Sequence, residues 1–135
     1  MEIRIRHLDG VKFEAETRGH RILCDQPQGN GGADGGMTPP EFLLASLGTC
    51  AGFYAAQYLK KHHLPETGLE VRVAAEKASA PARLASFRID VTAPGLAPEH
   101  EAGMLRSVNA CLIKNTLAQP PAIETVLHTE QVARV

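Results

Sequence analysis

The fold of this chain is decided by residues 38–50, which read TPPEFLLASLGTC. Thr38 suits the N-cap of a helix, and Pro39 suits the first helical position. Glu41 follows Thr38 by three residues, which is the spacing of a capping box, in which each residue bonds the backbone of the other. The stretch therefore predicts the start of a helix, and we expect that helix to run to about residue 62 or 63.

Apolar side chains continue along this helix at helical spacing. Leu43, Leu47, Cys50 and Tyr54 follow one another at intervals of four, three and four residues, so they share one face. Other apolar residues widen that face until it covers much of the circumference. We therefore expect the helix to be central and largely buried, with a cysteine on its packing face.

The composition is that of one small domain, residues 1–135, with an aliphatic core, because aromatic residues make up only 4% and there is no Trp. A formal net charge of -1 argues against a nucleic-acid-binding protein, which needs a basic patch. The N-terminus alternates charged and apolar residues instead of forming a signal peptide. No segment approaches the roughly 20 apolar residues of a bilayer span. We predict a cytoplasmic protein without a nucleic-acid or membrane partner.

Alternation of apolar and polar residues predicts strands on both sides of the central helix. Residues 1–25 read as a three-stranded antiparallel meander, and residues 69–91 read as a second hairpin. A second helix begins near Pro98 and carries Cys111 on its apolar face, and residues 123–131 read as a closing strand. The order βββ-α-ββ-α-β predicts an α+β fold in which central helices pack on antiparallel sheets.

The three cysteines, Cys24, Cys50 and Cys111, form no CxxC pair, so structural zinc is not indicated. A free cysteine packs well as a small apolar side chain, and we expect that role for Cys24. Cys50 and Cys111 both lie on packing faces, so they are either inert core residues or a reactive pair. A reactive thiol must ionise, and Cys50 in mid-helix gains little from the helix dipole. Its activation would then require an arginine or histidine from elsewhere in the fold.

The residues around the two helical cysteines resemble a known family. Residues 38–50 resemble the first-cysteine motif of the OsmC/Ohr superfamily, and residues 111–117, which read CLIKNTL, resemble its second-cysteine motif. Gly19-His20 followed by Asp25, and the GGADGG run at 31–36, resemble the OsmC-like branch more than Ohr itself. The resemblance implies an intertwined homodimer with two sites at the subunit interface.

The resemblance also implies a reaction. Family members with proven chemistry are thiol-dependent peroxidases that act on organic hydroperoxides. By this likeness Cys50 is the peroxidatic thiol and Cys111 the resolving thiol, and an external dithiol reduces the disulfide that forms between them. The apolar tail of the peroxide would contact Leu43, Leu47, Phe53 and Tyr54. No cofactor or metal is implied.

The sequence departs from the hydroperoxide reductases at two positions. Their catalytic glutamate falls at Pro40 here, and the carboxylate comes one residue later, at Glu41. Glu41 is therefore either a catalytic residue or only a helix cap. The first hairpin turn, residues 8–10, lacks the arginine that activates the thiolate, which leaves Arg18 and Arg21 as substitutes. These departures motivate an alternative function, namely a protein of this fold that binds a small ligand or senses redox state with little or no turnover.

Other chemistry has weaker support in the sequence. The Gly-rich loop at 26–37 has no phosphate-binding motif. His62 and His63 are adjacent, so they diverge around a helix and cannot easily share one metal ion. His20 could form a Cys–His nucleophile with Cys50, but no oxyanion-hole motif accompanies it. We therefore predict a thiol peroxidase in oxidative-stress defence, in preference to a hydrolase or a metalloprotein.

Overall fold

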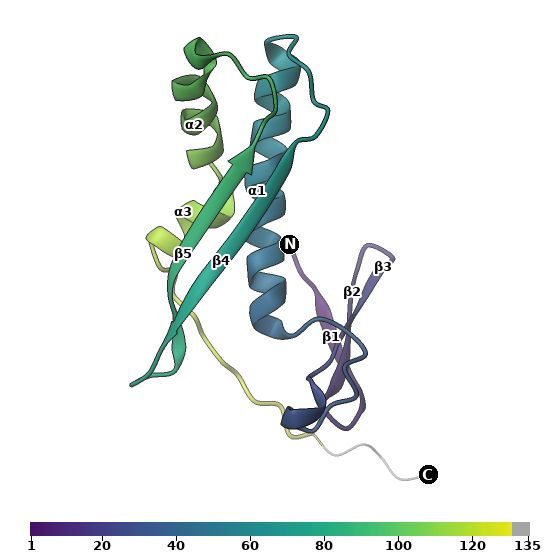
Figure 1. Ribbon diagram of the computed structural model, residues 1–135. Coiled ribbons are helices and arrows are strands. Elements are labelled where there is room, and N and C mark those ends of the chain that lie inside the picture. Colours follow the sequence, from purple (N-terminus) through teal and green to yellow (C-terminus); the bar gives the residue numbers. More distant parts are fainter. Residues whose placement is uncertain (131–135) are drawn as a thin grey trace.

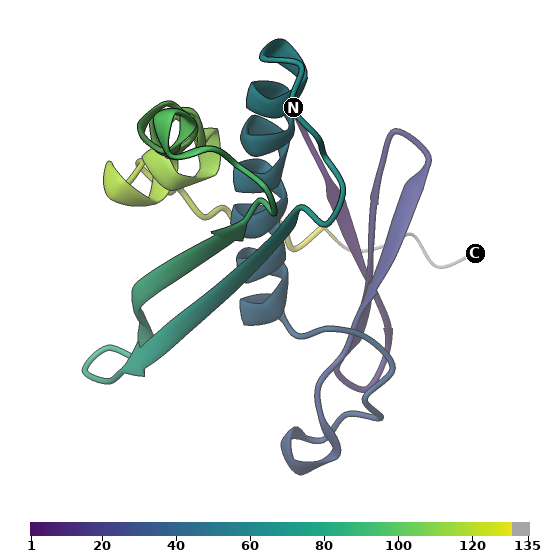
Figure 2. The same cartoon turned by 45° about the horizontal axis from the view of Figure 1, so that its top comes forward.

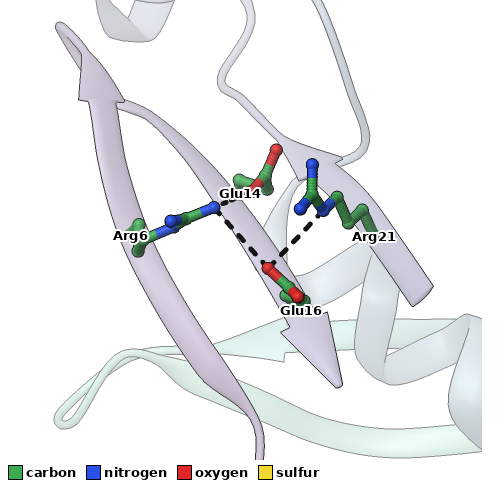
Figure 3. Close-up of polar contacts among 4 residues, drawn as sticks. All are labelled: Arg6, Glu14, Glu16 and Arg21. Carbon is green, nitrogen blue, oxygen red and sulfur yellow. Dashed lines mark hydrogen bonds and ion pairs between the residues drawn. The ribbon is translucent and has the colours of Figure 1, made fainter. Parts of the chain in front are cut away.

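The computed structural model describes residues 1–130. Its N-terminal part is a three-stranded antiparallel sheet in the order β1-β2-β3, with bounds β1 Arg4–Asp9, β2 Lys12–Thr17 and β3 His20–Cys24. One face of this sheet is charged, because Arg6 pairs with Glu14 at 2.7 Å and with Glu16 at 3.6 Å, and Arg21 pairs with Glu16 at 3.5 Å (Figure 3). Since neighbouring residues of a strand point to opposite faces, the other face is apolar. The predicted meander is confirmed.

The central helix α1 spans Pro39–Lys61. Its capping box is formed as predicted: the Glu41 N–H donates to Thr38 Oγ1 at 3.4 Å, and the Thr38 N–H donates to Glu41 Oε1 at 3.0 Å. Within the single chain a narrow stripe of α1 is fully buried, namely Leu47, Ala51, Ala55 and Leu59. Cys50 is half-buried at the edge of this stripe.

The second hairpin, β4 Glu70–Ala78 and β5 Arg83–Thr92, crosses α1 and packs against it (Figures 1 and 2). Gly48 permits this contact, because a Cβ atom there would lie 2.9 Å from Val73 Cγ2. On another side of α1, a short 3-10 turn at Pro98–His100 leads into α2, Glu101–Asn109. The core is formed by Ala51, Ala55, Leu59, Met104 and Val108.

By length and composition alone, α1 is apolar enough to cross a membrane, with 23 residues and a mean hydropathy of 1.2 in its most apolar window. This finding corrects the expectation that no segment approaches a bilayer span. The core helix of a globular protein meets the same criteria. In this chain α1 packs against β4 and α2, which is the position of a core helix.

The predicted second helix is interrupted at Cys111. The helix α2 ends at Asn109, and a separate helix, α3, spans Leu112–Ala118, with Cys111 as its N-cap residue. The apolar spacing is compatible with one continuous helix, so periodicity could not locate the break.

The predicted closing strand is wrong for residues 123–130, which form no strand, and residue 131 lies outside the described part of the chain. A strand needs a neighbouring strand to bond, and this segment pairs with none among residues 1–130. Its apolar side chains are exposed, with Ile123 at 86% and Leu127 at 84%.

The Gly-rich loop between β3 and α1 is built around Asp25, whose side chain is only 1% exposed. The carboxylate accepts backbone N–H groups from Gln26 at 2.8 Å, Gly35 at 2.9 Å and Ala33 at 3.2 Å. Cys24 pairs with Met37 in an isolated parallel bridge. The loop therefore fastens the N-terminal sheet to the start of α1, where the two meet in Figure 1.

Candidate functional site

The two helical thiols come together where α1 faces the junction of α2 and α3. Cys50 lies on the third turn of α1 and is half-buried, and Cys111 is fully buried at the N-cap of α3. The side chains of Cys50 and Cys111 lie close enough for each to affect the ionisation of the other. Residues 61 positions apart in the sequence thus form one pair of sulfurs.

The surroundings affect the two thiols in opposite directions. Burial opposes ionisation of Cys50, but hydrogen bonds from the Cys111 side chain and from the backbone N–H groups of Ile113 and Leu112 outweigh it. The pKa of Cys50 therefore lies below its ordinary value. Burial, together with the hydrogen bond to Cys50, raises the pKa of Cys111. The pair thus provides one thiol that ionises more readily than an ordinary cysteine and one that ionises less readily.

The start of α3 supplies the amides that favour the Cys50 thiolate. The Lys114 N–H donates to Cys111 Sγ at 3.5 Å, which is the hydrogen bond of a helix N-cap. The Lys114 ammonium donates to Asn109 Oδ1 at 2.9 Å, across the break between the two helices. Backbone N–H groups in the first turn of a helix have no intrahelical partner, so they are free to bond a nearby sulfur. Sequence reasoning missed these amides, because no side chain signals them.

An apolar groove of about 650 Å³ is formed by α1, β5 and α3, and two of its lining residues, Leu47 and Lys114, are each three positions along the chain from a cysteine of the pair. Leu43 and Leu47 of α1 line it, as predicted, together with Phe87 and other residues of β5 and with Lys114 and Leu117 of α3. Phe53 and Tyr54 were also expected in this wall, and neither is part of it. Phe53 is 56% exposed and packs edge-on against the Tyr54 ring.

Glu41 lies away from the thiols within the single described chain. It precedes Cys50 by nine residues of one helix, which is roughly 13 Å along the axis. Hydrogen bonds from the backbone and the hydroxyl of Thr38 hold the pKa of Glu41 below its ordinary value. In this chain the carboxylate is an ionised helix cap.

The two candidate arginines belong to the N-terminal sheet. Arg18 has φ 51° and is followed by Gly19 with φ 81°, so these residues form a tight two-residue turn between β2 and β3. Arg21 on β3 pairs with Glu16 (Figure 3). Among residues 1–130, the groups that favour ionisation of Cys50 are Cys111 and two amides, with neither arginine among them.

The other predicted chemical groups are also placed away from the thiol pair. His20 is exposed at the start of β3, and Cys24 lines an apolar groove formed by the N-terminal sheet and the start of α1. His62 packs on Tyr58, with ring centroids 4.2 Å apart, and the Tyr58 hydroxyl is 2.8 Å from His100 Nδ1. Among the residues that the structure describes, no three His, Cys, Asp or Glu side chains are grouped so that they could hold a metal ion.

Comparisons with known proteins give a consistent result. A family model described as "OsmC-like protein" matches residues 31–126. The fold is similar to that of a protein from Psychrobacter arcticus 273-4 described as a putative osmotic stress induced and detoxification response protein. Its TM-score is 0.77 at 17% identity, with 84% of this chain and 85% of that chain covered. The comparison with curated proteins found no match.

Two further solved structures are similar. An OsmC-like protein from Mycoplasma pneumoniae gives a TM-score of 0.70 at 17% identity, with 88% of this chain and 87% of that chain covered. A protein from Legionella pneumophila, described as an organic hydroperoxide resistance protein OsmC, gives 0.59 at 13% identity, with 87% of this chain and 89% of that chain covered. At these identities the structures establish a shared fold.

Proposed function

The chain belongs to the OsmC-like protein family, and we propose that it is a thiol-dependent peroxidase that reduces organic hydroperoxides with Cys50 and Cys111. The observation that carries the proposal is the proximity of these two thiols, one at α1 and one at the N-cap of α3, with the pKa of Cys50 lowered and that of Cys111 raised. A peroxidatic thiol must be ionised to attack the peroxide, whereas a resolving thiol can be protonated until the sulfenic acid has formed. The Legionella relative, described as an organic hydroperoxide resistance protein, adds support.

The reaction proceeds in three steps. The Cys50 thiolate attacks one oxygen of the hydroperoxide, the O–O bond breaks, and the alkoxide takes a proton and leaves as the alcohol. Cys50 is thereby oxidised to a sulfenic acid. The Cys111 thiol condenses with it to form a disulfide and one molecule of water. An external dithiol then reduces the disulfide by exchange and is itself oxidised to a disulfide.

The groove formed by α1, β5 and α3 favours a peroxide with an apolar substituent. Its walls at Leu43, Leu47 and Phe87 offer apolar surface that hydrogen peroxide cannot use. Burial of an apolar tail would contribute roughly 25 cal/mol per Å² of area removed from water. Organic hydroperoxides should therefore react more readily than hydrogen peroxide.

The test is dithiol-dependent consumption of peroxide by the purified protein. We expect cumene hydroperoxide to be consumed with a kcat/KM at least about tenfold above that of hydrogen peroxide, since tenfold corresponds to about 1.4 kcal/mol of additional binding. Equal consumption of the two peroxides would argue against the groove as the substrate site. If the protein consumes neither peroxide, the proposal is wrong.

A second candidate function is ligand binding or redox sensing without efficient turnover. Two contacts favour it: Glu41 is bonded in a helix cap, and Arg21 is paired with Glu16. Because of these contacts, neither side chain acts on Cys50 within the described chain. This alternative predicts thermal stabilisation by an apolar ligand with negligible peroxide consumption. Rapid turnover would exclude it.

The chain is also proposed to act as a homodimer in which the partner completes the site. The apolar face of the N-terminal sheet lines a groove of about 550 Å³ and leaves Ile5 55% exposed and Ile22 49% exposed. Residues 123–130 carry further exposed apolar side chains and an unpaired strand pattern. Apolar surfaces of this kind mark interfaces. The partner would cover them and could bring its own Glu41 or arginines toward Cys50.

Light scattering coupled to size-exclusion chromatography tests the dimer. We expect a mass of twice the 14.5 kDa chain at micromolar concentration, because exposed apolar area on this scale stabilises association. A mass of one chain under the conditions of peroxide turnover would contradict a shared site.

A cytoplasmic location is part of the proposed function, because the cytoplasm is the reducing compartment that keeps an external dithiol reduced.

A further inference from the structure

Helix α3 needs its N-terminal cap. It has seven residues, none of them fully buried, so little packing holds it in place. Isolated helices of this length are marginal in water. At its N-terminus, the Lys114 N–H donates a hydrogen bond to the side chain of Cys111, with 3.5 Å between the nitrogen and Sγ. The position of α3 therefore depends strongly on the side chain of residue 111.

The geometry points to a second role for Cys111, and we propose that it is a positioning residue as well as the resolving thiol. By capping α3, its sulfur holds the backbone N–H groups of Leu112 and Ile113 against the sulfur of Cys50.

The hydrogen bonds at the junction support this role. Lys114 donates its backbone N–H to Cys111, and Leu112 and Ile113 donate theirs toward Cys50. The backbone N–H of Ile113 acts on both sulfurs, so the first turn of α3 favours the ionised form of each thiol. A loss of the bond at Cys111 frees that turn, and the amides next to Cys50 move with it.

The burial of Cys111 is consistent with the proposed role. Its side chain is 0% exposed, and its backbone, at φ -54° and ψ 125°, is outside the helical region, as an N-cap residue requires. The groups of the junction that act on Cys50 are this thiol and two backbone amides, and the Lys114 ammonium is bonded to Asn109. The amides of α3 thus do for Cys50 what a cationic side chain does for other reactive cysteines.

Serine and alanine at position 111 separate the two roles. Neither residue can resolve a sulfenic acid, but serine is among the best N-cap residues and alanine among the poor ones. The comparison uses Cys111→Ser and Cys111→Ala, each in a Cys24→Ser background. The measurement is the pH dependence of Cys50 alkylation by iodoacetamide, followed by mass spectrometry of the Cys50 peptide, without peroxide.

We expect Cys111→Ser to keep the apparent pKa of Cys50 near that of the parent protein. We expect Cys111→Ala to raise it by about one unit, which makes alkylation about tenfold slower at a pH below both values. Hydrogen exchange at the amides of Leu112 and Ile113 should be faster in the alanine variant and unchanged in the serine variant. Circular dichroism checks that both variants are folded.

Two outcomes would overturn the proposal. Equal pKa values in the serine and alanine variants would show that the cap does not matter for Cys50. A raised pKa in the alanine variant without faster exchange would assign the effect to the direct bond between the thiols. The value of this role for catalysis rests on the proposed peroxidase function, but alkylation is measured without peroxide, so the two can fail separately.

Discussion

Replacing Cys50 with serine is expected to lower dithiol-dependent reduction of an organic hydroperoxide by on the order of 1,000-fold or more. A serine hydroxyl stays protonated at neutral pH and cannot form a sulfenic acid, so the first step has no nucleophile. Stopped-flow or coupled consumption of cumene hydroperoxide measures the effect. The serine variant should also form no disulfide with Cys111 after exposure to peroxide, which mass spectrometry can verify.

The matched control is Cys24→Ser. Cys24 lies in the apolar groove of the N-terminal sheet, separate from the groove formed by α1, β5 and α3. Because the partner is proposed to cover this groove of the N-terminal sheet, turnover is compared at a concentration at which light scattering gives the variant the mass of the parent, and we then expect it to remain within about twofold of the parent value. Undiminished turnover in the Cys50 variant, or a comparable loss in the Cys24 control, would contradict the assigned role of Cys50.

The pH dependence of the same reaction has a defined sign. Only the thiolate reacts, and the pKa of Cys50 is lowered because hydrogen bonds from Cys111 and two amides outweigh burial. The rate should therefore rise with pH and reach half of its maximum below the ordinary pKa of a cysteine thiol. In the same scheme Cys111 stays protonated at neutral pH, because burial raises its pKa.

Replacing Gly32 with alanine is expected to lower the free energy of unfolding by about 1–3 kcal/mol. A Cβ atom at this position would collide with the carbonyl oxygen of Gln26 and would lie 2.9 Å from Asp25 Oδ1. The collision is with backbone, which cannot move away as the end of a long side chain can. Urea unfolding at pH 7 measures the change through the shift of the transition midpoint.

The matched control for this change is Gly29→Ala in the same loop. A Cβ atom there meets nothing within 4 Å, so we expect a change within about 0.5 kcal/mol. Equal stability of the two variants would show that the loop does not depend on its contact with Asp25.

Hydrogen bonds from Gly35 and Gln26 hold the pKa of Asp25 below its ordinary value. The carboxylate therefore contributes fully at neutral pH, and its contribution declines only as the pH falls below the ordinary aspartate pKa.

Local parts of the fold were predictable, because each depends on residues that are close in the sequence. Thr38 and Glu41 are three residues apart, so their capping box could be read directly from the chain. The two hairpins follow from alternation around short turns, as in the Arg18-Gly19 turn between β2 and β3. The presence of a thiol on α1 was predictable for the same reason.

The failures concern contacts that a local pattern does not specify. The apolar spacing of the second helix continues through Cys111, so the break between α2 and α3 gave no signal. The alternation at residues 123–130 is that of a strand, but a strand also needs a paired neighbour, and this segment pairs with none of the strands among residues 1–130.

Local sequence was enough to predict the capped helix that starts at residue 38 and the cysteine on it, whereas Cys111 lies at the break between α2 and α3. The tertiary structure alone decided that Cys50 faces the start of α3, where Cys111 and two backbone amides favour its thiolate. The physical reason is that backbone N–H groups are the same in every residue other than proline. Their effect on a thiol depends on where the chain places them, and these two cysteines are 61 positions apart.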